Sequence, residues 1–329
     1  MKKLSVLLFL IFTISAFSQE NLAKLEWNGY AQLCASSNFI DNNSFSLRRL
    51  KFWMKSSPEF SEHWSYKVQA TISSIAQEKF FLQDVKIAYT LGLFSVDFGQ
   101  FVPEYSLQRF QSDYSLSTIE RAKAIDALIP SGSLGVRDIG IQANFSSKNK
   151  HIQTHFGIFN GYGVKEYRFQ NQGYMLSHKT ILNIPLNQNK FQIGYSLQYR
   201  YTQNLEIPKV LPDSFLYTGN DFRSNIFVHF QARFFELQAE YLNANFEGEK
   251  AEGFYFLSTL NVNKNQFVFS YEKYTDLIEK TTDKPYYRLA YNYLINKNKI
   301  KLYFDNFFQI NEGKIENYIA SIQMQVFFK

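Results

Sequence analysis

Residues 190–201 read Lys-Phe-Gln-Ile-Gly-Tyr-Ser-Leu-Gln-Tyr-Arg-Tyr, and this alternation decides the fold. Successive side chains of a β-strand point to opposite faces, so one face would carry only apolar and aromatic residues, from Phe191 to Tyr201. The other face would carry polar, charged or small residues such as Gln192 and Arg200. Strands of about 10 residues with this pattern, repeated along a chain, are typical of a barrel that crosses a bilayer around a polar lumen.

Sixteen segments of the chain fit such a strand. They lie at residues 24–36, 44–55, 63–74, 79–89, 93–101, 137–146, 150–161, 174–184, 190–202, 223–234, 235–246, 253–263, 266–274, 286–294, 299–309 and 315–328. A soluble β-sandwich is the alternative, but its strands average only about 5–6 residues. We therefore predict an all-β fold, a transmembrane antiparallel β-barrel of about 16 strands.

Charged residues in the middle of these segments predict which face points inward. Segment 79–89 has Asp84 and Lys86 at its centre, and segment 235–246 has Glu236 and Glu240 on one face. A basic residue facing lipid near the middle of the bilayer costs about 2–4 kcal/mol, and an acidic one somewhat less. The charged faces are therefore expected to line a polar lumen.

The N-terminus predicts the destination of the chain. Residues 1–18 combine Lys2 and Lys3, an apolar stretch over 4–14 and a small-x-small ending, which is typical of a secretory signal peptide. A short membrane anchor is the alternative, but a spanning helix needs about 20 apolar residues. We predict that residues 19–329 form one barrel domain in the outer membrane of a Gram-negative bacterium, in contact with its lipid.

Composition narrows the chemistry. Without Lys2 and Lys3 the chain keeps 33 Lys and Arg against 29 Asp and Glu, a net charge of +4 that does not indicate nucleic-acid binding. The single cysteine, Cys34, excludes an internal disulfide and a cysteine-based metal site. No phosphate-binding glycine loop and no HExxH motif occur. We expect no cofactor, no metal and no enzymatic activity.

Histidines leave two alternatives to weigh. His151 and His155 share one strand face, but four strand residues separate their side chains by about 13 Å, too far for one zinc ion. A barrel enzyme remains an alternative, with His155 or His229 at the rim, although no nucleophile is apparent. A non-conducting binding barrel, such as an adhesin or a plugged receptor, is a further alternative.

The connections alternate between short polar turns and longer loops. Bacterial barrels have short periplasmic turns and long external loops, so residues 102–136 would be the third external loop. It is the longest loop and contains many apolar residues, and we expect it to fold inward and narrow the barrel. Ser117-Thr118-Ile119-Glu120 matches a capping box and predicts a short helix over about 118–128.

Several motifs point to one family. They are Asn28–Gln32, Leu47–Lys51, Gly99-Gln100-Phe101, Glu120-Arg121, Gly135–Gly140 and Phe159-Asn160-Gly161. Together they resemble the phosphate-selective porin O and P family. This resemblance implies a homotrimer of 16-stranded barrels with an inward third loop, a porin for small hydrophilic solutes, and basic residues that attract anions.

The resemblance also implies site residues. Glu120 and Arg121 match the family's acidic-basic pair in the loop, and Arg137 and Asp138 match the pair that opens the sixth strand. We expect a positively charged constriction from Arg109, Arg121, Lys123 and Arg137, with Glu120 and Asp138 holding neighbouring arginines. The predicted basic residues of the lumen are Arg49, Lys51, Lys67 and Lys86.

Two observations leave the anion preference open. The charges around the third loop could instead tether it to the wall. The inward-facing residues are also of mixed sign, because Asp84, Asp138, Glu236, Glu240 and others oppose the basic ones. The sequence therefore predicts passive diffusion of small hydrophilic solutes, with an anion or phosphate preference as its finer form.

Overall fold

The computed structural model describes residues 25–73, 79–129, 136–161, 163, 174–278, 284–296 and 299–328. The predicted signal peptide at residues 1–18 lies outside the described residues. Sixteen strands form within the described ranges: β1 (Glu26–Ser37), β2 (Asn43–Ser56), β3 (Trp64–Ser73), β4 (Lys79–Leu91), β5 (Phe94–Phe101), β6 (Asp138–Ser146), β7 (Ile152–Phe159), β8 (Met175–Leu186), β9 (Asn189–Glu206), β10 (Leu216–Gln231), β11 (Phe235–Phe246), β12 (Glu249–Val262), β13 (Asn265–Tyr274), β14 (Tyr286–Leu294), β15 (Ile300–Asn311) and β16 (Lys314–Phe328).

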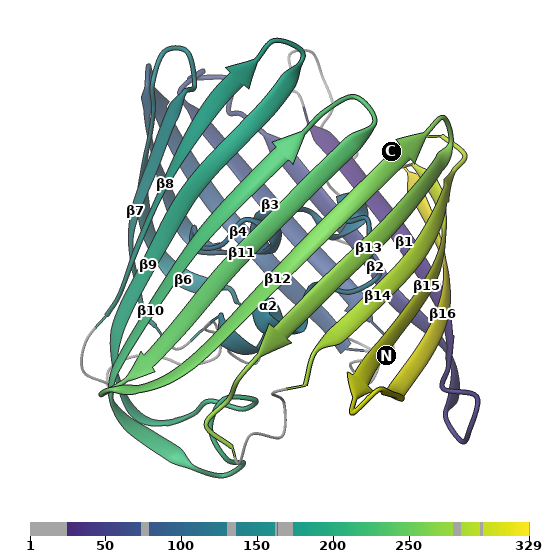
Figure 1. Cartoon of the computed structure of the whole chain (residues 1–329). Helices are drawn as coiled ribbons and strands as arrows, with labels where there is room; N and C mark the ends of the chain where they lie inside the picture. The colour runs from purple at the N-terminus through teal and green to yellow at the C-terminus, as the bar shows by residue number, and fades with distance from the viewer. Residues whose placement is uncertain are drawn as a thin grey trace, which may run out of the picture.

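The strands close into one antiparallel barrel (Figure 1). Each strand pairs with its neighbours in sequence, and β1 pairs with β16 from Gly29 opposite Phe328 to Ser37 opposite Ala320. The prediction of a 16-stranded antiparallel barrel is therefore confirmed. Among the described residues, no helix is both long and apolar enough to cross a membrane.

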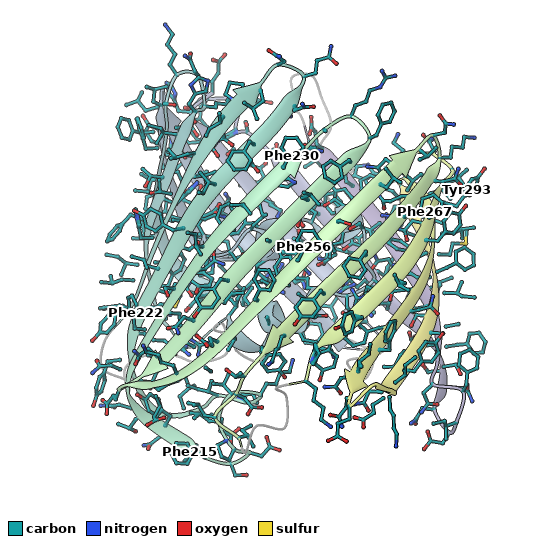
Figure 2. The ribbon with its side chains drawn as sticks, viewed as in Figure 1. Phe215, Phe222, Phe230, Phe256, Phe267 and Tyr293 are labelled. Atoms are coloured by element: carbon teal, nitrogen blue, oxygen red, sulfur yellow. The ribbon has the colours of Figure 1, made fainter. Side chains whose placement is uncertain are left out.

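The two faces of the strands differ as the alternation predicts. On β10, Asp221 and Arg223 are each only 1% exposed, whereas the intervening Phe222 is 41% exposed. Figure 2 shows Phe222, Phe256 and Phe267 on the outer surface of the strands. Burial of polar residues inside and exposure of apolar residues outside reverse the arrangement of a soluble protein, and they suit a barrel surrounded by lipid.

The largest difference from the predicted strands lies between β9 and β10. The sequence predicts a loop over residues 203–222, but β9 continues to Glu206 and β10 begins at Leu216. The two strands pair along this extension, with a register shift between Tyr217 and Gly219. The extension lacks the strict alternation of apolar residues that a lipid-facing strand requires. The alternating pattern in the sequence therefore ends before the hydrogen bonds between β9 and β10 do.

The position of a new charge should decide its cost. Ile226 faces outward at mid-strand in β10 and is 51% exposed, whereas Thr71 of β3 faces inward. We expect Ile226→Lys to lower the free energy of unfolding by about 2–4 kcal/mol in lipid, because lysine would lose its hydration there. Thr71→Lys is the matched control and should cost much less. Urea unfolding of both variants in vesicles measures the difference, and equal losses would contradict this orientation.

Candidate functional site

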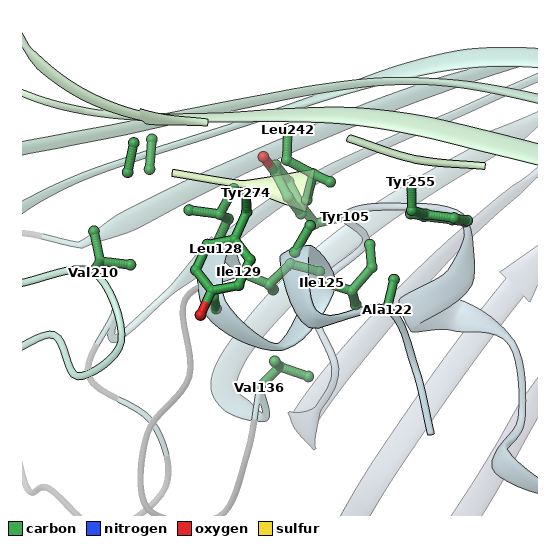
Figure 3. Packing of buried hydrophobic residues seen from close by; sticks show 14 of the residues in the cluster. Tyr105, Ala122, Ile125, Leu128, Ile129, Val136, Val210, Leu242, Tyr255 and Tyr274 are labelled. Carbon is green, nitrogen blue, oxygen red and sulfur yellow. The ribbon is translucent and has the colours of Figure 1, made fainter. Parts of the chain in front are cut away.

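Residues 102–129, called here the 102–129 segment, follow β5. They contain three short helices: η2 (Gln108–Phe110), η3 (Asp113–Ser115) and α2 (Lys123–Leu128). Figure 1 shows these helices between the near and the far walls of the barrel. Ile125 and Leu128 of α2 share a buried apolar cluster with Leu242 of β11 and Tyr255 of β12 (Figure 3). Apolar packing therefore holds α2 against one side of the wall.

A glycine in the wall allows this close approach. Gly253 of β12 lies directly beneath α2. A Cβ at this position would lie 2.8 Å from the Cβ of Ala124 and 2.9 Å from Cδ1 of Leu128. Both separations are shorter than side-chain carbons tolerate, so α2 would have to move if residue 253 carried a side chain.

Charged side chains of the wall bind the backbone of the 102–129 segment. Basic side chains donate to its carbonyl oxygens: Lys179 to Ser106 at 2.8 Å, Lys301 to Leu116 at 2.8 Å, Arg288 to Glu120 at 2.7 Å and Arg223 to Leu128 at 2.7 Å. Carboxylates accept from its N–H groups: Glu240 from Leu107 at 2.9 Å and from Gln108 at 2.7 Å, Asp305 from Ile119 at 3.4 Å, and Glu272 from Lys123. These anchors come from β8, β10, β11, β13, β14 and β15.

These anchors give the mixed charges of the lumen a structural role. A segment with little regular structure leaves its backbone donors and acceptors unpaired, and each needs a partner when buried. Glu240, Glu272 and Asp305 supply acceptors, while the basic residues between them supply donors. Hydrogen bonds to charged groups contribute about 1.5–3 kcal/mol each. On this side of the barrel, both signs of charge bind the segment.

The opposite side borders a cavity of about 880 Å³, lined by β1–β6 and the 102–129 segment. Nine basic residues line it: Arg48, Arg49, Lys51, Lys55, Lys67, Lys86, Arg109, Arg121 and Arg137. Five acidic residues line it: Asp84, Asp97, Glu104, Asp113 and Glu120. The lining therefore carries an excess of four positive charges. All the predicted basic residues of the lumen face this cavity, as do three of the four predicted for the constriction.

A row of lysines crosses three neighbouring strands of the cavity wall. Lys55 of β2 lies directly opposite Lys67 of β3, and Lys67 lies directly opposite Lys86 of β4. Like charges in directly opposed positions repel one another. Lys67 pairs with Asp84 at 2.6 Å and Lys86 with Asp97 at 3.0 Å, whereas Lys55 makes no ion pair with any described residue. The lysine row therefore concentrates positive charge at one level of the barrel.

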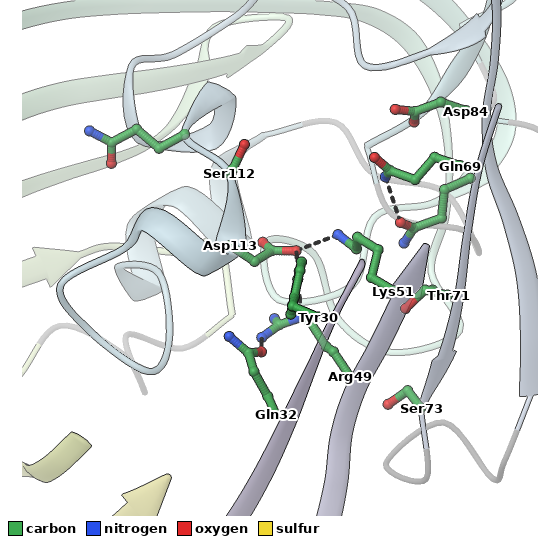
Figure 4. A network of polar contacts seen from close by, with 12 residues as sticks. Tyr30, Gln32, Arg49, Lys51, Gln69, Thr71, Ser73, Asp84, Ser112 and Asp113 are labelled. Atoms are coloured by element: carbon green, nitrogen blue, oxygen red, sulfur yellow. Dashed lines mark hydrogen bonds and ion pairs between the residues drawn. The ribbon is translucent and has the colours of Figure 1, made fainter. Parts of the chain in front are cut away.

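Asp113, the first residue of η3, is held by a group of donors (Figure 4). Lys51 Nζ lies 2.6 Å from its Oδ2, Arg49 Nε lies 3.6 Å from the same atom, and Tyr30 donates to it at 3.3 Å. Arg121 donates to the other carboxylate oxygen. Burial would raise the pKa of Asp113, but Lys51, Arg121 and Arg49 outweigh it and hold the pKa well below its usual range.

The two arginines predicted for the constriction have different surroundings. Arg121 is buried, and besides Asp113 it donates to the carbonyl oxygens of Gln108 and Gln111. It therefore ties parts of the 102–129 segment together. The Arg109 guanidinium makes no ion pair or hydrogen bond with the described part of the chain, and burial together with nearby Arg121 lowers its pKa to about 9. Arg109 therefore presents an uncompensated charge to the cavity.

Arg48 reaches the cavity through an irregularity in the sheet. Gln32 of β1 lies opposite Arg49 and Leu33 lies opposite Leu47, so Arg48 has no partner in the register. This β-bulge allows two consecutive residues, Arg48 and Arg49, to face inward. Arg48 forms an ion pair with Glu120. Glu120 therefore holds an arginine of β2, whereas the sequence suggested that it would hold the adjacent Arg121.

The remaining predicted residues take other partners. Arg137 pairs with Asp84 at 2.6 Å, whereas Asp138 accepts from the backbone N–H groups of Ile139 and Gly161, each at 2.7 Å. Asp138 therefore connects the start of β6 to the chain that follows the end of β7. Lys123 is exposed and is absent from the cavity lining.

The predicted capping box does not form. Helix α2 begins at Lys123 after Ala122, with no side-chain cap. Residues 117–120 form bends instead, and the wall binds their backbone: Asn292 donates to the Ser117 carbonyl and Asp305 accepts from the Ile119 N–H. Residues 130–135 of the predicted loop lie outside the described residues.

The histidines do not gather. Within the described ranges, no group of three or more His, Cys, Asp or Glu side chains is arranged to hold a metal ion. His155 instead shares a hydrogen bond of 2.7 Å with the side chain of Asn144.

Comparisons with known proteins agree with this architecture. The family model described as phosphate-selective porin O and P matches residues 25–259. No curated protein matches the chain in sequence. Solved structures with the same fold include OmpF of Salmonella typhi in complex with daunomycin, with a TM-score of 0.68 and 10% identity over 93% of this chain and 98% of that one.

Two further solved structures share the fold. In-vitro folded OmpT, an outer membrane protein of Vibrio cholerae, has a TM-score of 0.63 and 8% identity over 94% of this chain and 99% of its own. OprB of Pseudomonas putida has a TM-score of 0.61 and 9% identity over 92% of this chain and 94% of its own. At these identities the likeness concerns the fold alone.

The anchoring of the 102–129 segment can be tested at one carboxylate. We expect Glu240→Gln to speed amide hydrogen exchange at Leu107 and Gln108 roughly tenfold or more, because an amide replaces the carboxylate that accepts both N–H groups. Glu236→Gln is the matched control, since Glu236 accepts from His229 and Gln238 instead. Mass spectrometry of the peptide covering 103–111 provides the measurement. Unchanged exchange in Glu240→Gln would show that other contacts fix this turn.

Proposed function

We propose an anion preference for this chain, which belongs to the phosphate-selective porin O and P family and is an outer-membrane porin. In this proposal small hydrophilic solutes diffuse passively through the barrel, and anions, phosphate among them, pass more readily than cations. The lysine row formed by Lys55, Lys67 and Lys86 is the observation that carries the proposal.

The lysine row is difficult to explain by stability. Directly opposed like charges destabilise a pair of strands, and two such pairs follow one another here. Asp84 and Asp97 offset part of this repulsion at Lys67 and Lys86, but Asp84 is shared with Arg137 and Lys55 has no ion pair with a described residue. Neutral residues would relieve the repulsion without opening the barrel. A cluster of basic residues in a pore attracts anions and repels cations. A role in transport would therefore explain why the lysines are placed opposite one another.

The distribution of charge supports the same conclusion. Acidic residues of β11, β13 and β15 bind N–H groups of the 102–129 segment, so they compensate partial positive charges of the backbone. The cavity on the other side keeps an excess of four positive charges in its lining. Anions would therefore follow the β1–β6 side. Guanidinium groups such as Arg109 and Arg137 suit phosphate, because they donate two parallel hydrogen bonds.

The 102–129 segment takes the part of an inward third external loop in this proposal. Its anchors on β8 to β15 and its ion pairs with β2 would hold it across the barrel. Solutes would then pass through the narrowed space beside it. Among the predicted residues, Arg109 and Arg137 would attract the anion, while Arg121 would keep the segment in shape.

Family membership supports the remaining parts of the proposal. We infer that residues 1–18 direct secretion, that the barrel resides in a Gram-negative outer membrane and that three copies assemble. Passive diffusion through such a barrel requires no cofactor and no catalytic residue.

Two uncompensated cations offer a direct test. We expect the double variant Lys55→Gln with Arg109→Gln to lower the chloride-over-potassium permeability ratio about twofold or more, because positive charge then leaves the cavity without breaking an ion pair. The reversal potential of reconstituted channels in a salt gradient measures this ratio.

The matched control removes the same charge elsewhere. Lys148 and Arg233 lie in exposed turns and do not line the cavity. Lys148→Gln with Arg233→Gln should leave the reversal potential unchanged. A wild-type channel that favours cations, or a barrel without stepped currents, would overturn the proposed function.

A further inference from the structure

Four aromatic rings gather on the inner side of the barrel, where β1, β2 and β16 meet η3. They belong to Tyr30 of β1, Trp53 of β2, Tyr114 of η3 and Phe327 of β16. The rings of Trp53 and Tyr114, called here the ring pair, are nearly parallel, with an interplanar angle of 9° and centroids 6.0 Å apart. Both residues are half-buried and line the cavity, so a solute can reach part of their surface.

The other two rings hold the ring pair in place. Trp53 meets both of them edge-on, with centroids 6.2 Å from Tyr30 and 5.6 Å from Phe327. Phe327 also meets Tyr114 edge-on at 5.3 Å, and the carbonyl oxygen of Tyr114 accepts from Gln325 at 3.0 Å. A ring that is already fixed loses little conformational freedom when it binds a ligand, so the ring pair is preorganised.

The fold itself does not require an aromatic surface in the cavity. The interior of an outer-membrane barrel is polar. Ile125 and Leu128 of α2 are fully buried against the wall, whereas the ring pair keeps surface in the cavity. An apolar surface that stays in contact with water costs free energy, and such surfaces are typical of places where ligands bind.

A cation lies beside the ring pair on the same strand. Lys51, Trp53 and Lys55 follow one another along the inward face of β2, and neighbouring side chains on one face are about 7 Å apart. Lys51 is engaged with Asp113, whereas Lys55 is exposed and makes no ion pair with any described residue. A flat ring that stacks on Trp53 would therefore bring an attached anionic group within reach of Lys55.

We propose that the ring pair and Lys55 form a binding site in the lumen for organic anions whose charge is attached to a flat ring, such as aromatic carboxylates. Stacking on the ring pair would recognise the ring, and Lys55 would supply the opposite charge. The inference rests on the proposed function and deepens it, because it names a class of organic anion that the channel holds more tightly than non-aromatic anions of equal charge.

Two probes of equal charge separate stacking from charge. Benzoate carries its carboxylate on a flat ring, and cyclohexanecarboxylate carries it on a ring of similar size that is not flat. In wild-type channels, benzoate should halve the chloride current at a concentration about fivefold lower than cyclohexanecarboxylate does. Trp53→Leu should abolish this difference, because leucine is apolar but has no flat ring. Trp53→Phe keeps a flat ring and should retain most of the difference.

Three further variants serve as controls. Lys55→Gln should weaken block by both probes and leave their ratio within about twofold of the wild type, because both probes carry the same charge. Phe110→Leu is the matched control in the same cavity, where Phe110 is 40% exposed and pairs with no other ring in the described part of the chain. Trp27→Leu removes a tryptophan that is 48% exposed and does not line the cavity. The last two should leave the ratio unchanged.

Two additions protect the test from a variant that does not fold and from a channel that does not conduct. Tyr114→Leu removes the other member of the ring pair and replaces Trp53→Leu if that variant does not assemble into a heat-modifiable barrel. Calorimetric titration of both probes into the detergent-solubilised barrel gives the same ratio without a current.

The outcomes separate this inference from the proposed function. If the wild type shows no anion preference, the proposed function fails, and the calorimetric ratio still decides whether the ring site exists. If both probes bind the wild type alike, or if Phe110→Leu abolishes their difference and Trp53→Leu does not, the inference fails. Equal changes for both probes in Trp53→Leu also overturn it, because Trp53 would then only position the 102–129 segment.

Discussion

Pairing of β1 with β16 leaves no strand edge among the described strands, and the other features of the barrel depend on that closed ring of backbone hydrogen bonds. Lipid offers no partner to an open edge or to a charge, so closure and orientation are decided together. Once the ring closes, every strand must turn its polar residues inward. The interior then contains more charge than a soluble core of this size would tolerate.

The charged residues inside the barrel have two roles. From β8 to β15, basic and acidic side chains bind carbonyl and N–H groups of the 102–129 segment, much as a helix or a sheet would satisfy them. From β2 to β4, cationic side chains lie opposite one another around open space. The same chemical groups are therefore structural on one side and available to solutes on the other.

The strands could be predicted from the sequence because lipid imposes a simple rule on alternate residues. That rule ends outside the bilayer, which is why the extension of β9 and β10 up to Glu206 and Leu216 was predicted as a loop. The start of α2 was also predicted wrongly, because residues 117–120 form bends whose backbone groups bind side chains of the wall. Local capping preference is weaker than several hydrogen bonds to charged groups.

The candidate site could be predicted in part. Arg49, Lys51, Lys67 and Lys86 follow from alternation and from the cost of a charge in lipid. Asp113 has no comparable signal, since besides nearby Arg121 its partners include Lys51, 62 positions away, and Tyr30, 83 positions away, which only the closed barrel brings close. Lys55 lies at the end of β2, away from the middle of the bilayer. A charge that faces lipid costs little free energy there, so the sequence does not indicate which way Lys55 points. The division of the charges between anchors and cavity likewise depends on where the 102–129 segment lies.

The bulge at Arg48 has a consequence for how such channels can change over evolutionary time. A strand that follows strict alternation offers one inward side chain for every two residues, so a new charge in the lumen must replace an existing residue. An inserted residue absorbed as a bulge adds an inward side chain, while Gln32 and Leu33 of the adjacent strand keep consecutive partners on either side of it. Insertion of one residue into β2 can therefore change the charge of the lumen while the number of strands and the width of the barrel stay the same.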